Sequence, residues 1–422
     1  MNLDEKLENM IGYIGTKVPG LGVIVFKNGK EVYSKFLGRR HINIDKPVTR
    51  HTRFRAASLS KMFTMFTIMQ LVGEDKIYLD KDASEYLGFK LRNPNFADTP
   101  ITVRTLASHT SSIRDDKVYS LPPEFSVKEF FDEDGKFYNN GVHFAPKEEE
   151  IGKYFTYCNL NYGLLGTIIE RVTGERFDLY QKKHILQQLE TKADYVVGNL
   201  GKDEFNNLGT LYQKNKNGEW NEHFSWIAQI DDYTVQPEKD MVLVQNPYAR
   251  DMDTMYSLNN YNIGTNATIF SPTGGLRISF EELSHCLEML INGGTYKGRE
   301  IIRADLLSEM MKPQWTYNKK KPNGDTSSVM FNYGFGIYKI EGNGNARLCK
   351  NYAIDLIGHS GEAYGLISGL YFIPGTKNGV IFMINGEAVE PDKNEKSLGR
   401  FSNCYIWEEE LMNPICEYFF IN

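Results

Sequence analysis

The sequence predicts an α+β fold in which an antiparallel β-sheet flanked by helices is assembled from both ends of the chain. Two observations support this prediction. Apolar strand pairs with turn residues occur near the N-terminus and again near the C-terminus, whereas the centre of the chain is mainly helical in its pattern. One sheet with helices on its faces is the simplest arrangement that buries both strand pairs.

The N-terminal segment predicts a helix followed by a β-hairpin. Apolar residues recur at helical spacing over residues 3–17, as expected of an amphipathic helix. The next segment, GLGVIVFKNGKEVYSKFLG, contains two strands on either side of Asn28-Gly29. Asn-Gly favours the positive φ angles of a tight hairpin turn, so this pair predicts where the chain reverses.

The centre of the chain has two textures. Over residues 51–192 the apolar spacing is mainly helical, as in MFTMFTIMQLVG and YGLLGTIIERVTG. Residues 194–268 are rich in Asn, Asp, Gly and Tyr and predict an irregular region with a hairpin near 215–218. After it, GGLRISFEELSHCLEMLINGG predicts a short strand and then an amphipathic helix.

The C-terminal segment supplies the second strand pair. The stretch GLISGLYFIPGTKNGVIFMING contains two apolar runs, with turn residues at Pro374-Gly375 and Asn378-Gly379. Residues 402–420 then predict a closing helix. Helix and strands at one end, and strands and helix at the other, indicate one shared sheet.

Bulk composition excludes several classes of function. The net charge of −6 argues against a nucleic-acid partner, which needs a basic face. No apolar run approaches the roughly 18 residues of a membrane span. The five cysteines are odd in number and form no CxxC pair, so neither a disulfide framework nor a zinc site is predicted. The acidic N-terminus lacks signal-peptide features, which predicts a cytoplasmic protein; an exported form whose leader has been removed is the alternative.

The first chemical motif is Ser58-Leu59-Ser60-Lys61, at the start of an apolar segment. A buried helix here would place backbone N–H groups and the positive helix end beside the Ser58 hydroxyl. Lys61 follows three residues later, so its amine returns to the same helix face. A serine hydroxyl needs such a neighbour to take its proton before it can attack. Alone, the pattern also fits an N-cap serine followed by an exposed lysine.

The second motif is Tyr157-Cys158-Asn159, which precedes a helical segment. A nearby ammonium lowers a phenol pKa from about 10, while burial lowers a lysine pKa, so the base is either Tyr157 or Lys61. Asn159 can accept a hydrogen bond from Lys61 and donate its amide to a substrate carbonyl. A rival motif, Tyr138-Asn139-Asn140, lies in turn-forming sequence with no helix behind it and is not favoured.

The third motif is His359-Ser360-Gly361, the only HxG among eight histidines, directly before an apolar strand. A glycine on a strand edge lets a substrate backbone approach closely. Strand N–H groups at this point can complete an oxyanion hole with the backbone N–H of Ser58.

In this order and context the three motifs resemble the SxxK serine hydrolases, which include class C β-lactamases, DD-peptidases, D-aminopeptidases and related esterases. Further segments that resemble the family's sequence pattern are residues 54–57, 101–112, 157–166, 271–276 and 333–336. Together with the motifs they cover most of the chain except about residues 194–268.

The resemblance implies a sheet lobe from residues 1–50 and 270–422 and a mainly helical lobe from 51–269, with the active site in the cleft between them. It implies that residues 194–268 line this cleft and set substrate choice. It also implies that no cofactor or metal is required.

The resemblance also implies a mechanism through an acyl-enzyme. Ser58 attacks a carbonyl, and its proton passes to Lys61 or Tyr157. The oxyanion is held by the backbone N–H groups of Ser58 and Glu362, and Tyr157 serves the leaving group. The implied substrate-binding residues are Asn159, His359, Ser360, Gly361 and Glu362.

The third motif bears on the substrate. Relatives with KTG carry a permanent cation, whereas His359 has an ordinary pKa near 6.5 and would hold a carboxylate weakly, and less well as pH rises. We therefore expect a peptidase or amidase that acts on D-amino-acid or peptidoglycan-like substrates. Its expected partner is the substrate, a small molecule or a peptide. A β-lactamase, a carboxylesterase and a slowly turning-over penicillin-binding sensor are the alternatives.

Two further features remain open at this point. Glu362, beside the oxyanion strand, either pairs with a substrate amine or points into solvent. The cysteine usage and the missing leader fit an intracellular amidase or esterase better than a cell-wall peptidase, and the sequence does not resolve that conflict.

Overall fold

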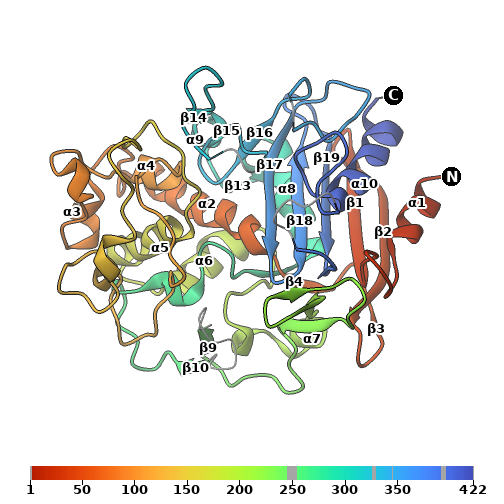
Figure 1. Ribbon diagram of the computed structural model, residues 1–422, viewed down its shortest axis with the longest axis horizontal. Coiled ribbons are helices and arrows are strands. Elements are labelled where there is room, and N and C mark those ends of the chain that lie inside the picture. The colour runs from red at the N-terminus through yellow and green to blue at the C-terminus, as the bar shows by residue number, and fades with distance from the viewer. Residues whose placement is uncertain (1, 245–253, 326–328, 345, 391–395, 422) are drawn as a thin grey trace.

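The computed structural model describes residues 2–244, 254–325, 329–344, 346–390 and 396–421. Within these residues the largest element is a nine-stranded sheet with the order β14-β15-β16-β17-β18-β19-β1-β2-β3 (Figure 1). All its pairings are antiparallel, and β1 pairs with β19, so strands from the two chain ends are neighbours. The predicted α+β class, with an antiparallel sheet flanked by helices, is confirmed.

The central strands of this sheet are long, and the strands toward both of its edges are short. In chain order they are β1 (Gly20–Lys27), β2 (Lys30–His41), β3 (Lys46–Pro47), β14 (Trp315–Thr316), β15 (Asn332–Tyr333), β16 (Tyr338–Ile340), β17 (Leu356–Ala363), β18 (Leu366–Phe372) and β19 (Gly379–Ile384). The hairpin predicted at Asn28-Gly29 is present, and both residues have the positive φ angles, 54° and 77°, that the turn requires.

Helices cover both faces of the central strands, as Figure 1 shows. Alternate residues of β1, β18 and β19 contribute to two different core clusters, one on each face, as the pleat of a strand dictates. One face is covered by α8 (Phe280–Ile291), and Gly22 on β1 lies so close that an added Cβ would be 2.4 Å from the Phe280 ring. The other is covered by α1 (Leu3–Met10), α10 (Ile406–Ile415) and the π-helical turn η9 (Cys416–Phe420).

The first helix is shorter than predicted. The apolar spacing predicts a helix over residues 3–17, but α1 ends at Met10. Ile11 is extended and forms a parallel bridge with Val18, and Ile14 is 84% exposed instead of buried. The bridge satisfies backbone groups that a longer helix would have used.

Most of the remaining helices lie beside the sheet, on the left of Figure 1. They are α2 (Ser60–Gly73), α3 (Ala83–Leu87), α4 (Val103–Ala107), α5 (Asn159–Thr173), α6 (Phe177–Gln181) and α9 (Ala304–Met311). The apolar segment predicted to be a buried helix is α2, which packs against both α5 and α9. No helix within the described ranges is both long enough and apolar enough to span a membrane.

The irregular region contains short strands that connect it to the C-terminal part of the chain. Its elements are α7 (Lys202–Asn206), β5 (Leu211–Gln213), β6 (Asn215–Lys216), β7 (Glu219–Trp220), β8 (Ile227–Ile230), β9 (Met241–Val244) and β10 (Thr254–Ser257). The predicted hairpin is β6–β7, and β5 pairs in parallel with β20 (Gly386–Glu387). The remaining strands are β4 (Arg53–Arg55), β11 (Arg277–Ser279), β12 (Thr295–Tyr296) and β13 (Arg299–Glu300).

Candidate active site

Ser58 lies in a short 3-10 turn, η1 (Ala57–Leu59), between β4 and α2. The α-helix itself begins at Ser60, so the serine precedes the helix instead of opening it. Strand β4 pairs with β11, and the Ala56 N–H donates to the Leu276 carbonyl at 2.8 Å, which fixes the start of the turn. Ala57 has a φ of 49°, an unfavourable angle for a residue with a Cβ. This strained turn exposes part of Ser58 at the end of a buried helix.

Lys61 is completely buried one turn later, with its amine at the Ser58 hydroxyl. Its Nζ lies 3.0 Å from Ser58 Oγ, 2.8 Å from Asn159 Oδ1 and 3.1 Å from the carbonyl oxygen of Thr273. Burial lowers the pKa of Lys61 to about 7, and the nearby Asp115 only partly opposes this change. At neutral pH a large fraction of the amine is therefore uncharged.

Tyr157 and Asn159 reach the same point from the start of α5. The Tyr157 hydroxyl donates to Ser58 Oγ at 2.9 Å, so Ser58 contacts both candidate proton carriers. Burial raises the pKa of Tyr157 above its ordinary value, although Lys61 Nζ lies 4.7 Å from its ring centroid. The phenolate predicted as one possible base is therefore disfavoured, and Tyr157 is a proton donor in the resting site.

Asp115 organises the start of α5, and the sequence interpretation did not single it out. Its carboxylate accepts from the backbone N–H of Asn159 at 2.7 Å and from that of Leu160 at 2.8 Å. It also accepts from the Asn159 side-chain amide at 2.9 Å. Cys158, at the cap position of α5, makes no side-chain cap bond, so Asp115 takes over that role from a distant loop. No local pattern marks Asp115, because its partners lie on another segment.

His109, in the segment of residues 101–112, packs against Tyr157 and binds the backbone next to it. Its Nδ1 accepts from the Cys158 backbone N–H at 3.1 Å, and its ring centroid lies 4.4 Å from that of Tyr157. Burial and the neighbouring Lys61 hold the pKa of His109 well below 6.5. The uncharged ring therefore packs against the phenol and fixes the backbone that carries it.

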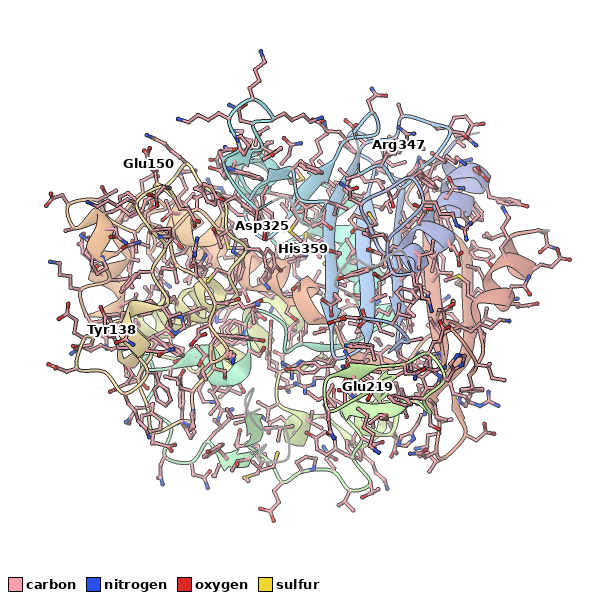
Figure 2. The ribbon with its side chains drawn as sticks, in the orientation of Figure 1. Tyr138, Glu150, Glu219, Asp325, Arg347 and His359 are labelled. Atoms are coloured by element: carbon pink, nitrogen blue, oxygen red, sulfur yellow. The ribbon has the colours of Figure 1, made fainter. Side chains whose placement is uncertain are left out.

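The third motif lies on β17, where Figure 2 shows His359 at the side of the sheet that faces the helices. His359 is fully buried, and its Nε2 lies 3.1 Å from the Tyr333 hydroxyl. Burial and Lys61 lower the pKa of His359 to about 3. The expectation that its hold on a carboxylate falls as pH rises through neutrality is wrong, because the ring is already uncharged across that range.

Gly361 allows β17 to pack directly against the serine turn. A Cβ on Gly361 would lie 2.7 Å from the Ala56 carbonyl oxygen, 2.5 Å from Ser368 Oγ and 3.1 Å from the Ser58 backbone nitrogen. We expected the glycine to admit a substrate backbone; the structure shows a close approach of the protein's own chain. Ser360 Oγ accepts from the Tyr338 hydroxyl at 2.9 Å, and Glu362 is exposed.

The rival motif is remote from these residues. Tyr138 lies in the helical part, far from His359 in Figure 2, and precedes the exposed 3-10 turn η4 (Asn139–Gly141). No cluster of three or more His, Cys, Asp or Glu side chains suited to a metal ion occurs among the described residues.

Ser58 and Lys61 at the start of α2 thus meet Tyr157 and Asn159 at the start of α5. Comparison with known proteins identifies the family of the chain, because the β-lactamase family model matches residues 4–402. The chain belongs to the β-lactamase family.

Individual relatives match parts of this β-lactamase-family chain. Protein flp of Staphylococcus aureus is 29% identical over 175 residues, 42% of this chain and 34% of the relative. A D-aminopeptidase of Brucella anthropi is 32% identical over 191 residues, 43% of this chain and 33% of the relative. The chain thus matches about a third of the length of these curated relatives.

A solved structure shows the same fold over a longer range. The octameric penicillin-binding protein homologue from Pyrococcus abyssi superposes with a TM-score of 0.62 at 24% identity, covering 92% of this chain and 73% of that one. At this identity the match supports the fold alone.

Proposed function

We propose that this chain hydrolyses amides through an acyl-enzyme, with Ser58 as nucleophile, Lys61 as base and Tyr157 as acid, and that D-amino-acid or peptidoglycan-like amides are its substrates. The single observation that carries the proposal is the position of the buried, low-pKa amine of Lys61 3.0 Å from Ser58 Oγ. A base whose pKa lies near the working pH is the most effective one for proton removal.

The contacts of Lys61 support its role as the base. An uncharged amine has two N–H donors and one lone pair. The Asn159 Oδ1 and the Thr273 carbonyl oxygen accept the two donors, at 2.8 Å and 3.1 Å. The third neighbour, Ser58 Oγ at 3.0 Å, then faces the lone pair and can donate its hydroxyl proton to it.

The chemical steps balance with these two groups alone. Ser58 Oγ attacks the carbonyl carbon while its proton moves to Lys61 Nζ. Tyr157 then gives its proton to the leaving amine, and the acyl-enzyme remains. A water gives one proton to the Tyr157 phenolate and attacks the ester, and Ser58 leaves with the proton held by Lys61.

The oxyanion in this proposal is held by the backbone N–H groups of Ser58 and Glu362. The close packing of Gly361 against Ala56 and the Ser58 nitrogen supports it, because it holds the serine turn and β17 together. Two facts support an amide of the D-amino-acid type. The uncharged His359 offers no fixed cation for a penicillin-type carboxylate, and one relative is named a D-aminopeptidase.

The test combines acylation with turnover. Wild type and Ser58→Ala would be incubated with a penicillin, a p-nitrophenyl ester and matched D- and L-alanine p-nitroanilides, and followed by intact-mass spectrometry and absorbance. We expect turnover of the D-anilide and the ester, both abolished by Ser58→Ala.

Each other outcome identifies a different activity. Rapid penicillin hydrolysis without anilide turnover would establish a β-lactamase instead, and a persistent penicillin adduct would establish a sensor. Ester turnover alone would establish an esterase. Turnover that survives in Ser58→Ala would overturn the assignment of the nucleophile.

A further inference from the structure

A cavity of about 420 Å³ is lined by Arg55 and Glu362, which are close in sequence to Ser58 and Gly361, and it takes no part in the chemistry described so far. It is bordered by Arg55, three residues before the nucleophile, and by Glu362 and Tyr364, which follow the Gly361 strand segment. Strand β9 and the segment before Ser271 close it from the irregular region. Its described lining does not include Lys61 or Tyr157, the groups proposed to act on the leaving group. The cavity thus lies away from the groups proposed to act on the leaving group, and it adjoins the proposed oxyanion position through Glu362.

Two arginines, Arg55 and Arg277, lie next to each other in the lining of this cavity. Arg55 on β4 is directly opposite Arg277 on β11 in the antiparallel register, and like charges in that position repel. Arg277 is buried and forms two hydrogen bonds with Asp231, at 3.1 Å and 2.9 Å. The charges of Arg277 and Asp231 therefore balance each other. Arg55, in contrast, forms no ion pair within the part of the chain that the structure describes.

Arg55 is nevertheless fixed in place. Its Nε donates to the Gly274 carbonyl oxygen and its Nη2 to Ser271 Oγ, both at 3.1 Å. Its guanidinium lies 5.2 Å from the ring centroid of Tyr364. Burial and the repulsion of Arg277 lower the pKa of Arg55 from its ordinary value. A guanidinium oriented by neutral groups and lacking a counter-ion is prepared for an anion.

We propose that Arg55 binds a carboxylate carried by the acyl portion of the substrate, so that the enzyme prefers acyl groups with a second, anionic end. This inference rests on the proposed acyl-transfer function and names a substrate class for it. An acidic amino-acyl group fits the cavity in both charges, because it brings a carboxylate to Arg55 and an ammonium toward Glu362.

The test uses esters that differ only in one charge. The p-nitrophenyl esters of succinate, glutarate and adipate, each with a free terminal carboxylate, are compared with the same esters whose terminus is a neutral carbamoyl group. We expect at least one carboxylate ester to exceed its carbamoyl partner in kcat/KM by about tenfold or more. Arg55→Gln lowers that ratio to about one while changing the carbamoyl ester by less than about threefold.

Two further variants separate charge from packing. Arg55→Lys keeps the charge but loses the planar fork, so it retains part of the preference. Arg303→Gln removes an exposed guanidinium, paired with Asp305, from a distant surface and leaves the ratio unchanged. Absence of preference in wild type at every length, or its survival in Arg55→Gln, would overturn the proposal.

A binding measurement keeps the two proposals distinguishable. Calorimetry on Ser58→Ala compares glutaramate with glutaramide, which differ only in the terminal carboxylate. We expect tighter binding of glutaramate, and loss of the difference in Ser58→Ala/Arg55→Gln. If wild type hydrolyses no ester, the acyl-transfer function fails, and the calorimetry alone decides Arg55: equal binding of the two ligands overturns its role.

Discussion

The carboxylate of Asp115 accepts two hydrogen bonds from Asn159, one from its backbone N–H at 2.7 Å and one from its side-chain amide at 2.9 Å. The opposite end of that amide, Oδ1, accepts from Lys61 at 2.8 Å. Asp115 therefore orients the asparagine whose oxygen positions the base. It is a positioning residue, because it makes no contact with Ser58 itself.

Asp115→Asn tests this relationship. The change presents N–H groups to donors, so we expect kcat to fall by about 10- to 100-fold with a smaller effect on KM. Asp115 also raises the pKa of Lys61, so its neutralisation shifts the midpoint of the pH–rate profile downward. Asp116→Asn is the matched control, because Asp116 contacts the exposed Asn139 instead. An unchanged midpoint would contradict the electrostatic role.

The pH dependence of acylation reports the base. Because the pKa of Lys61 is about 7 and only its uncharged form accepts the serine proton, kcat/KM should rise tenfold per pH unit below about 7 and then level off. Lys61→Arg keeps the positive charge but cannot deprotonate, so we expect a loss of at least about 100-fold at every pH.

His359 should not contribute to that profile. Its pKa of about 3 keeps it uncharged throughout the range in which Lys61 titrates. We expect His359→Gln to retain the midpoint near 7 even if the rate itself falls. A midpoint that moves toward 6 or disappears in His359→Gln would show that His359, and not Lys61, titrates in the wild-type profile.

Lys61 should also make stability depend on pH. Its folded-state pKa of about 7 lies below the ordinary 10.5, so between these values the unfolded chain binds more protons. The free energy of unfolding therefore rises with pH in that window, and below it the full cost of burying the ammonium applies. We expect Lys61→Met to gain stability over wild type by about 2 kcal/mol at pH 6, and by less toward pH 10.

Chemical denaturation at several pH values measures this difference. The control is Lys76→Met, which removes an exposed lysine paired with Glu74. Its stability relative to wild type should stay constant with pH. A Lys61→Met difference that is equally constant would mean that the lysine is not destabilised by burial.

The features that could be predicted from sequence are those that short-range spacing determines. Ser58 and Lys61 are three residues apart on one helical turn, and Asn28-Gly29 encodes its own hairpin. The motif Tyr157-Cys158-Asn159 is distinguished from its rival because a helical pattern follows it. Even the correct class of fold followed from local strand and helix patterns at the two ends of the chain.

The remaining features depend on pairings between distant segments. Asp115 caps a helix from another loop, and Arg55 lies opposite Arg277 only because β4 pairs with β11. The pKa shifts of Lys61 and Tyr157 are caused mainly by burial, and the two short motifs do not reveal how deeply these side chains are buried. The early end of α1 has a local cause, since Val18 returns to pair with Ile11 only seven residues away.

Glu362 is predicted to recognise a substrate amine. It lines the cavity next to the proposed oxyanion position, so a carboxylate there favours an acyl group with a free ammonium. We expect Glu362→Gln to lower kcat/KM for free D-aminoacyl anilides by about tenfold relative to their N-acetyl forms. Glu300→Gln, on the exposed strand β13, is the charge-matched control. Unchanged selectivity in Glu362→Gln would place the carboxylate in solvent.

Gly361→Ala tests whether β17 must touch the serine turn. The new methyl would lie 2.7 Å from the Ala56 carbonyl oxygen and 2.5 Å from Ser368 Oγ, closer than any relaxed contact, so the strand and the turn must separate. We expect ester hydrolysis to fall by more than about 100-fold, because the two proposed oxyanion donors move apart. Gly274→Ala is the matched control, since its methyl would meet Ala57 at 3.6 Å, an ordinary contact, and should keep most activity. If Gly361→Ala folds with wild-type stability and full activity, the oxyanion hole does not depend on this packing and must be sought at other backbone N–H groups.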